Sequence, residues 1–141
     1  MARTFICRPD YPVADTANGK IRGFELDDIF IFRGIRYAVA ERFMPARLPE
    51  PWEGIKDATN YGPNAPTYGD PLPSCEILIP HGFWPENEAC QYLNIWTASL
   101  DPSAKKPVVV WFHGGGFSNA SALAQVAYEG DALCGSGAVV V

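Results

Sequence analysis

The sequence lacks the features that mark membrane-spanning, secreted and nucleic-acid-binding proteins. No apolar run approaches the roughly 20 residues that a membrane-spanning helix needs. The first residues, Met1 to Pro9, contain no apolar core long enough for a signal peptide. Lys and Arg number 11 against 16 Asp and Glu, and the net charge of −5 disfavours a nucleic-acid partner. We therefore expect a cytoplasmic protein with no membrane span and no nucleic-acid partner.

Histidine and cysteine are also scarce. The two histidines, His81 and His113, are too few to complete a zinc site, and the four cysteines show no metal-ligand spacing. We therefore expect neither a metal nor a cofactor. Free thiols in a reducing compartment are the favoured interpretation of the cysteines, and a Cys75–Cys90 disulfide is the alternative.

Proline and glycine, by contrast, are abundant. The 141 residues include 13 of each, which predicts many loops and short strands. Hydrophobic residues make up 48% of the chain and aromatic residues 13%, values that indicate a globular domain rather than a disordered segment.

The first forty residues predict a small antiparallel meander. Val13 to Thr16 and Gly19 to Phe24 are separated by Asn18-Gly19, which is a hairpin signal. Asp27-Asp28 predicts a second turn. Ile29 to Tyr37 then predicts a third strand, and the glycine within it indicates a β-bulge.

The rest of the chain alternates irregular segments with short elements. Recurring prolines between Arg42 and Pro73 predict a long loop, with a short strand at Ile55 to Ala58. Gln91 to Thr97 predicts another strand. Ser121 to Tyr128 predicts a short helix and Gly130 to Cys134 a helical turn.

One strand followed by glycines is the strongest indication of a binding site. Pro107 to Phe112 is an apolar, β-branched run without polar alternation, which predicts a strand covered on both faces. His113 and the glycines at positions 114–116 follow, and such loops bind ligands at the carboxyl ends of strands in open α/β sheets. Their N–H groups can converge on a phosphate or on an oxyanion. The phosphate alternative ranks last, because both the P-loop ending and the dinucleotide-binding glycine spacing are absent.

The chain ends on a second apolar run, Ala138 to Val141, which predicts another buried strand. A terminal strand with no turn or polar cap after it leaves an open sheet edge. We therefore expect residues 1–141 to be the N-terminal part of a single domain, truncated at its C-terminal end. The partner of this part is expected to be the remainder of the same protein, C-terminal to Val141.

A series of short motifs extends from about Val13 to the end of the chain. The motifs are Gly19-Lys20-Ile21-Arg22-Gly23, Phe32-Arg33-Gly34-Ile35-Arg36-Tyr37-Ala38, Arg42-Phe43 with Pro45, Pro51-Trp52 with Gly54, Asp57-Ala58-Thr59, Tyr61-Gly62-Pro63, Glu88 with Cys90, Tyr92-Leu93-Asn94-Ile95-Trp96, Val110-Trp111-Phe112-His113-Gly114-Gly115-Gly116-Phe117, Tyr128-Glu129-Gly130 and Gly137-Ala138-Val139-Val140-Val141. In this order the chain resembles the N-terminal part of the type-B carboxylesterases, the cholinesterase-like branch of the α/β-hydrolase fold.

The resemblance implies an α/β fold, with a small antiparallel β-meander leading into the first strands of a large mixed, mostly parallel sheet. It also implies hydrolysis of small-molecule carboxylic esters by a serine nucleophile, a histidine base and an acidic partner. By position, Gly115 and Gly116 are the oxyanion-hole donors, and His113 and Gly114 support them. The family's catalytic base lies much later in the chain, so His113 is expected to orient the loop by hydrogen bonding.

The catalytic triad is not found in this sequence. The nucleophile motif G-x-S-x-G is absent, and the nearest match, Cys134-Gly135-Ser136-Gly137, has cysteine in place of the first glycine. We expect the full-length protein to be a carboxylesterase and this chain alone to be inactive. The alternative is a non-catalytic cholinesterase-like binding protein or an inactive fragment. The intact glycines and the missing signal peptide favour the enzyme.

The resemblance assigns four further side chains. Phe117 and Trp84 are candidates to line the substrate pocket, with plain packing as the alternative. Arg42 and Glu88 are expected to form a partly buried ion pair that fixes a loop more than it adds stability.

One departure concerns the cysteines. Ala65 stands where the family often has the first cysteine of a disulfide, so Cys90 lacks its usual partner unless Cys75 substitutes. This departure favours a bacterial-type, cytoplasmic esterase over a secreted one.

Overall fold

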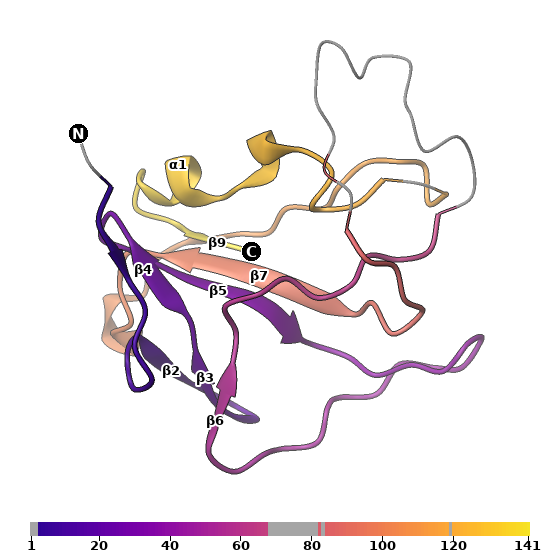
Figure 1. The fold of residues 1–141 in the computed structure, drawn as a ribbon, viewed down its shortest axis with the longest axis horizontal. Helices are drawn as coiled ribbons and strands as arrows, with labels where there is room; N and C mark the ends of the chain where they lie inside the picture. The colour runs from indigo at the N-terminus through magenta and orange to yellow at the C-terminus, as the bar shows by residue number, and fades with distance from the viewer. Residues whose placement is uncertain (1–2, 68–81, 83, 119) are drawn as a thin grey trace.

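Short strands in two sheets dominate the computed structural model, which describes residues 3–67, 82, 84–118 and 120–141 (Figure 1). The strands are β1 (Phe5–Ile6), β2 (Val13–Thr16), β3 (Gly19–Arg22), β4 (Phe24–Leu26), β5 (Ile29–Arg36), β6 (Ile55–Asp57), β7 (Tyr92–Thr97), β8 (Val108–Val109) and β9 (Val139–Val140). The larger sheet has the order β1-β4-β5-β7-β9-β8, and the smaller sheet has the order β2-β3-β6. Pairing is antiparallel except for β3 with β6 and β8 with β9.

The predicted hairpin is present, but its turn is shifted by one residue. Thr16 pairs with Gly19, so the two turn residues are Ala17 and Asn18 rather than Asn18 and Gly19. Gly19 begins β3 with a φ of 146°, and a Cβ there would lie 2.7 Å from atoms of Trp52. The glycine is therefore needed for a close approach within the strand, not for the turn itself.

The second predicted turn is confirmed at Asp27-Asp28. These residues have φ values of 49° and 65°, as a two-residue turn between right-twisted strands requires. The turn joins β4 to β5, in which Leu26 pairs with Ile29.

The predicted meander is divided between two sheets. β3 belongs to the smaller sheet, whereas β4, which follows it after a single residue, belongs to the larger one. That residue is Gly23, where a Cβ would lie 2.2 Å from the carbonyl oxygen of Ile31. Because glycine has no Cβ, the chain can pass against Ile31 as it changes sheets.

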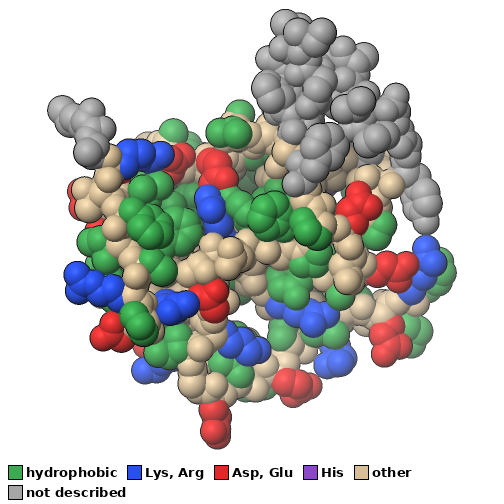
Figure 2. Space-filling view, in the orientation of Figure 1, with side chains coloured by type: hydrophobic (Ala, Val, Ile, Leu, Met, Phe, Trp, Pro, Cys, Tyr) green, Lys and Arg blue, Asp and Glu red, His purple; other side chains and the backbone are tan. Residues whose placement is uncertain are grey.

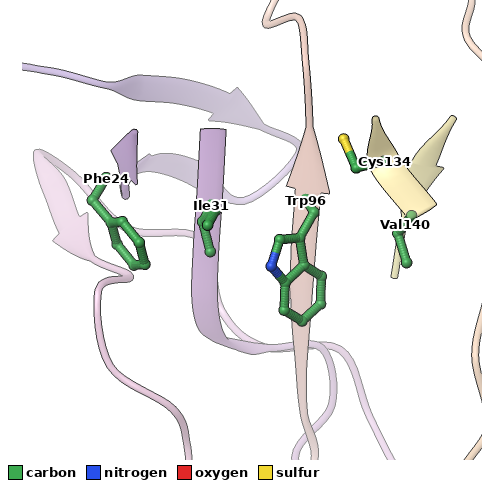
Figure 3. Close-up of a cluster of buried hydrophobic side chains, with 5 residues drawn as sticks. All are labelled: Phe24, Ile31, Trp96, Cys134 and Val140. Atoms are coloured by element: carbon green, nitrogen blue, oxygen red, sulfur yellow. The ribbon is translucent and has the colours of Figure 1, made fainter. Parts of the chain in front are cut away.

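Strand β5 lies at the centre of the fold and is packed on both faces. Ile31 belongs to a buried cluster with Phe24, Trp96, Cys134 and Val140 (Figure 3). The next residue along β5 belongs to a second cluster on the opposite face. The members of that second cluster are Ile21, Phe32 and Ala58. The larger sheet is therefore covered on one face by α1 (Asp131–Cys134) and on the other by the smaller sheet.

The predicted bulge in the third strand is confirmed. The register between β5 and β7 shifts between Phe32 and Ile35, and Gly34 within this interval has a φ of 66°. The side chain of Asn94 accepts the Gly34 N–H at 3.0 Å, which satisfies a donor that the bulge removes from the ladder.

Of the predicted strand at residues 107–112 only β8, Val108–Val109, forms, and it is not covered on both faces. β8 is the edge strand of the larger sheet and pairs only with β9. Val108 and Val110 are more than half exposed, and Phe112 is 83% exposed. The reason is its edge position, because within the described residues little of the chain packs against either face of this strand.

The predicted helix at residues 121–128 is wrong, whereas the helical turn that follows is confirmed. The Ser121 hydroxyl accepts the Leu123 N–H at 3.2 Å, and Gln125 is extended, with φ −135° and ψ 141°. Serine thus gives the backbone an alternative to helical bonding. Only the 3-10 helix η2 (Val126–Tyr128) forms here, and α1 follows it.

Charge is mixed over the surface rather than gathered. Figure 2 shows acidic and basic side chains interspersed on the face that it presents. In the part of the chain that the structure describes, no helix is long and apolar enough to cross a membrane. Cys75, His81 and the apolar residues 77–79 lie outside the described residues.

Candidate functional site

The glycine loop follows the strand β8 at the edge of the larger sheet. Its base is held by a parallel ladder that extends beyond the bounds of β8. Val139 N–H donates to Pro107 O at 2.8 Å, and Trp111 N–H donates to Val141 O at 2.7 Å. The last two strands of the chain thus fix the backbone to within two residues of His113.

The loop itself has an unusual backbone. Gly115, Gly116 and Phe117 have φ values of 115°, 60° and 63°, three consecutive residues in a region that side chains disfavour. Ser118 closes the turn, since its N–H and its hydroxyl both donate to Gly115 O, at 3.0 and 3.1 Å. Holding Phe117 in this conformation costs on the order of 1–3 kcal/mol, and strain of this kind clusters at functional sites.

The N–H groups of Gly115 and Gly116 make no hydrogen bond to the part of the chain that the structure describes. A Cβ at Gly116 would meet no atom within 4 Å, so the backbone at this glycine is open. Successive backbone N–H groups in a turn can form a concave site for a negatively charged oxygen.

His113 makes a hydrogen bond within the loop, as a supporting residue would. Its Nδ1 lies 2.7 Å from Gly114 O, the carbonyl immediately before Gly115. The imidazole is exposed. With a proton on Nδ1 the ring donates to this carbonyl and fixes the first peptide of the glycine run.

Phe117 and Trp84 are not in ring contact with each other in the described structure. The Phe117 side chain is fully exposed beside the glycines. Trp84 packs edge-on against Tyr61, with ring centroids 5.6 Å apart. The indole of Trp84 thus has a packing partner, whereas Phe117 projects from the loop without one among the described residues.

Arg42 and Glu88 meet, but at the surface. Arg42 Nε lies 3.4 Å from Glu88 Oε1, and the two side chains are 61% and 57% exposed. The expected partial burial is therefore wrong, because the irregular segment around Arg42 has little packed over it. An exposed pair of this kind contributes about 0–1 kcal/mol.

The described residues offer no group of three or more His, Cys, Asp or Glu side chains that could hold a metal ion. Cys7, Cys90 and Cys134 are free thiols. Two shallow hollows, of about 500 and 360 Å³, are lined by residues of the smaller sheet and its neighbours rather than by the glycine loop.

Sequence reasoning missed one cluster near the loop. Arg33, Tyr61 and Glu129 come from three separate motifs, and the fold brings them into contact. Each belongs to the series of motifs described above, but no local pattern pairs residues that lie up to 96 positions apart.

Comparison with known proteins agrees with this architecture. Residues 10–141 match the model of the carboxylesterase family. The chain is 41% identical over 114 residues to phenmedipham hydrolase of Pseudarthrobacter oxydans, covering 78% of this chain and 23% of that protein. It is 33% identical over 135 residues to para-nitrobenzyl esterase of Bacillus subtilis, covering 93% of this chain and 26% of that protein.

Solved structures of esterases also resemble this chain. An esterase from the anaerobe Clostridium hathewayi, described as able to hydrolyse aliphatic aromatic polyesters, superposes with a TM-score of 0.91 at 46% identity. The match covers 99% of this chain and 28% of that one. A carboxylesterase of Geobacillus stearothermophilus superposes with a TM-score of 0.73 at 34% identity, covering 91% of this chain and 25% of that one.

These neighbours have the α/β-hydrolase fold, so the fold class expected from the motifs is confirmed. The chain belongs to the carboxylesterase family. It spans about a quarter of the length of the relatives that it matches.

Proposed function

We propose that this chain supplies the oxyanion hole of a cytoplasmic serine carboxylesterase that hydrolyses small-molecule esters. Gly115 and Gly116 are the donors, and His113 and Gly114 hold their peptides in place. The observation that supports the proposal most strongly is the turn of positive φ that Ser118 closes, in which neither glycine N–H donates to an acceptor among the described residues.

The chemistry explains why such a loop matters. Attack of a serine hydroxyl on an ester carbonyl converts the carbonyl oxygen into an oxyanion. Donors already in place need no reorganisation at that moment, and each contributes about 3 kcal/mol in measured cases. The positive φ values of Gly115 and Gly116 belong to a turn, and successive N–H groups of a turn can bind one negatively charged oxygen.

The remainder of the reaction is assigned to residues outside this sequence. The serine, its histidine base and the acidic partner belong to the part of the protein that follows Val141. That part is also proposed to cover the exposed apolar side chains around β8, of which Val108, Val110 and Phe112 are examples. The isolated chain is accordingly proposed to be inactive.

The test uses the natural protein that contains residues 1–141 and a p-nitrophenyl ester. Gly115→Val is expected to lower kcat by about 10²–10³-fold, because it displaces one donor. The matched control is Gly54→Val, since Gly54 shares the positive φ, here 73°, and lies outside the glycine loop. Equal turnover in the two variants would contradict the assignment.

A further inference from the structure

The carboxylate of Glu129 joins two segments that are distant in sequence. Arg33 Nη2 donates to Glu129 Oε2 at 3.0 Å, and the Tyr61 hydroxyl donates to the other oxygen, Oε1. The side chains of Arg33 and Glu129 are only 24% and 32% exposed. Both oxygens of a half-buried carboxylate are thus bound, and charge-assisted bonds of this type are the stronger kind.

The two donors are themselves fixed. The guanidinium of Arg33 lies over the rings of Phe24 and Tyr61, 5.1 and 4.2 Å from their centroids. Burial, together with the hydrogen bond to Glu129, raises the pKa of Tyr61, so its hydroxyl keeps its proton and remains a donor. Arg33 is thereby held between two aromatic rings and one carboxylate.

The residues on either side of Glu129 extend this arrangement to the glycine loop. The ring of Tyr128 lies 5.5 Å from that of Trp111, centroid to centroid. Gly130 is so close to Trp96 and Val140 that a Cβ there would lie 2.8 and 2.9 Å from them. The segment at residues 128–130 is therefore fixed on both sides of Glu129, and its tyrosine packs on the residue that precedes Phe112 and His113.

We propose that Arg33, Tyr61 and Glu129 are positioning residues for the oxyanion loop, acting through Tyr128 and Trp111. The inference rests on the proposed function. None of the three touches the loop itself. They hold the tyrosine against the base of the loop, and the loop must place its N–H groups within about 0.5 Å to stabilise an oxyanion.

The variant Glu129→Gln in the natural protein tests the proposal, because it keeps the shape of the side chain and removes its charge. The expected result is a fall in kcat of about 10–100-fold with KM unchanged, as for a small misplacement of a catalytic group. The control is Asp57→Asn, which breaks the Arg22–Asp57 pair of the smaller sheet, whose side chains are 27% and 47% exposed. Equal loss of kcat in the two variants would overturn the proposal.

Hydrogen exchange of the peptide at residues 112–118 provides a readout that does not need activity. Faster exchange in Glu129→Gln than in Asp57→Asn supports the coupling, and equal exchange overturns it. If the unmodified protein hydrolyses no ester, the proposed function fails, while the exchange result still decides whether the cluster holds the loop. Tyr61→Phe, which removes only one hydroxyl, replaces Glu129→Gln in both measurements if the latter does not fold.

Discussion

Gly130 is the position where one added methyl group should disturb the core most clearly. Its φ of −84° and ψ of 1° are accessible to alanine, so the backbone itself does not oppose the substitution. A Cβ would nevertheless lie 2.8 Å from Trp96 and 2.9 Å from Val140, and both of these side chains are buried. Carbon atoms in contact prefer separations of about 3.5–4.0 Å.

The change in the free energy of unfolding caused by Gly130→Ala follows from two opposing contributions. Overpacking a well-packed core costs about 1–3 kcal/mol. Replacing glycine by alanine restricts the unfolded chain and recovers about 0.4–1 kcal/mol. Gly130→Ala is therefore expected to lower the free energy of unfolding by up to about 2.6 kcal/mol, the largest difference between the same two contributions.

The assay is urea unfolding of the natural protein, followed by tryptophan fluorescence. Gly114→Ala is the control, because Gly114 has no atom within 4 Å of an added Cβ and no positive φ. This control should be neutral or slightly stabilising. The packing argument would be refuted if both alanine variants shifted the unfolding midpoint by the same amount.

Two further predictions concern pH and the thiols. Burial raises the pKa of Asp57, but hydrogen bonds from Arg22 and Thr59 outweigh it and hold the pKa below that of an ordinary aspartate. The ionised Asp57 carboxylate therefore stabilises the fold above about pH 4, and this contribution is lost as the pH falls through the folded pKa. Asp57→Asn should make Tm fall less steeply between about pH 5 and 3. An equally steep fall of Tm in the variant and in the unmodified protein would contradict this. With a thiol reagent, exposed Cys7 should react in the native protein, whereas fully buried Cys134, whose thiol pKa burial raises, should react only after unfolding. In denaturant all four thiols of the chain should titrate, and a count of two would indicate a disulfide.

The parts of the fold that could be predicted are those encoded over a few residues. Asp27-Asp28 tolerates the positive φ values of a tight turn, and Gly34 marks the bulge of β5. Strand β7 follows from its own apolar residues. In each case the backbone conformation depends on the local sequence rather than on distant contacts.

The parts that could not be predicted depend on contacts between distant segments. Gly23 looks like an ordinary strand residue, and only the nearby carbonyl of Ile31 makes it the point where the chain changes sheets. The run at residues 107–112 has the composition of a buried strand, yet it forms a sheet edge in a chain that spans about a quarter of its relatives. The apolar composition of this run is that of a buried strand, and we propose that the rest of the protein buries it.

The candidate site likewise has one part that could be predicted from the sequence and one part that could not. The glycine loop was indicated by its place after an apolar strand, and its positive φ values agree with the backbone freedom that three glycines provide. The assignment of Gly115 and Gly116 as donors came from the family resemblance and stays a proposal. The cluster around Glu129 had no such signal, because an arginine after a phenylalanine and a glutamate after a tyrosine are common pairs. Only the packing of β5 against the segment at residues 128–130 brings Arg33 and Glu129 together.

The identity of the oxyanion donors is tested most directly by a crystal structure of the natural protein after reaction with a p-nitrophenyl phosphonate. The phosphonate becomes attached to the nucleophile and presents an oxygen where the oxyanion of the ester reaction would lie. We predict that this oxygen lies about 2.7–3.1 Å from the backbone nitrogens of both Gly115 and Gly116. A phosphonate oxygen bound by other groups, with both nitrogens beyond hydrogen-bonding distance, would contradict the assignment.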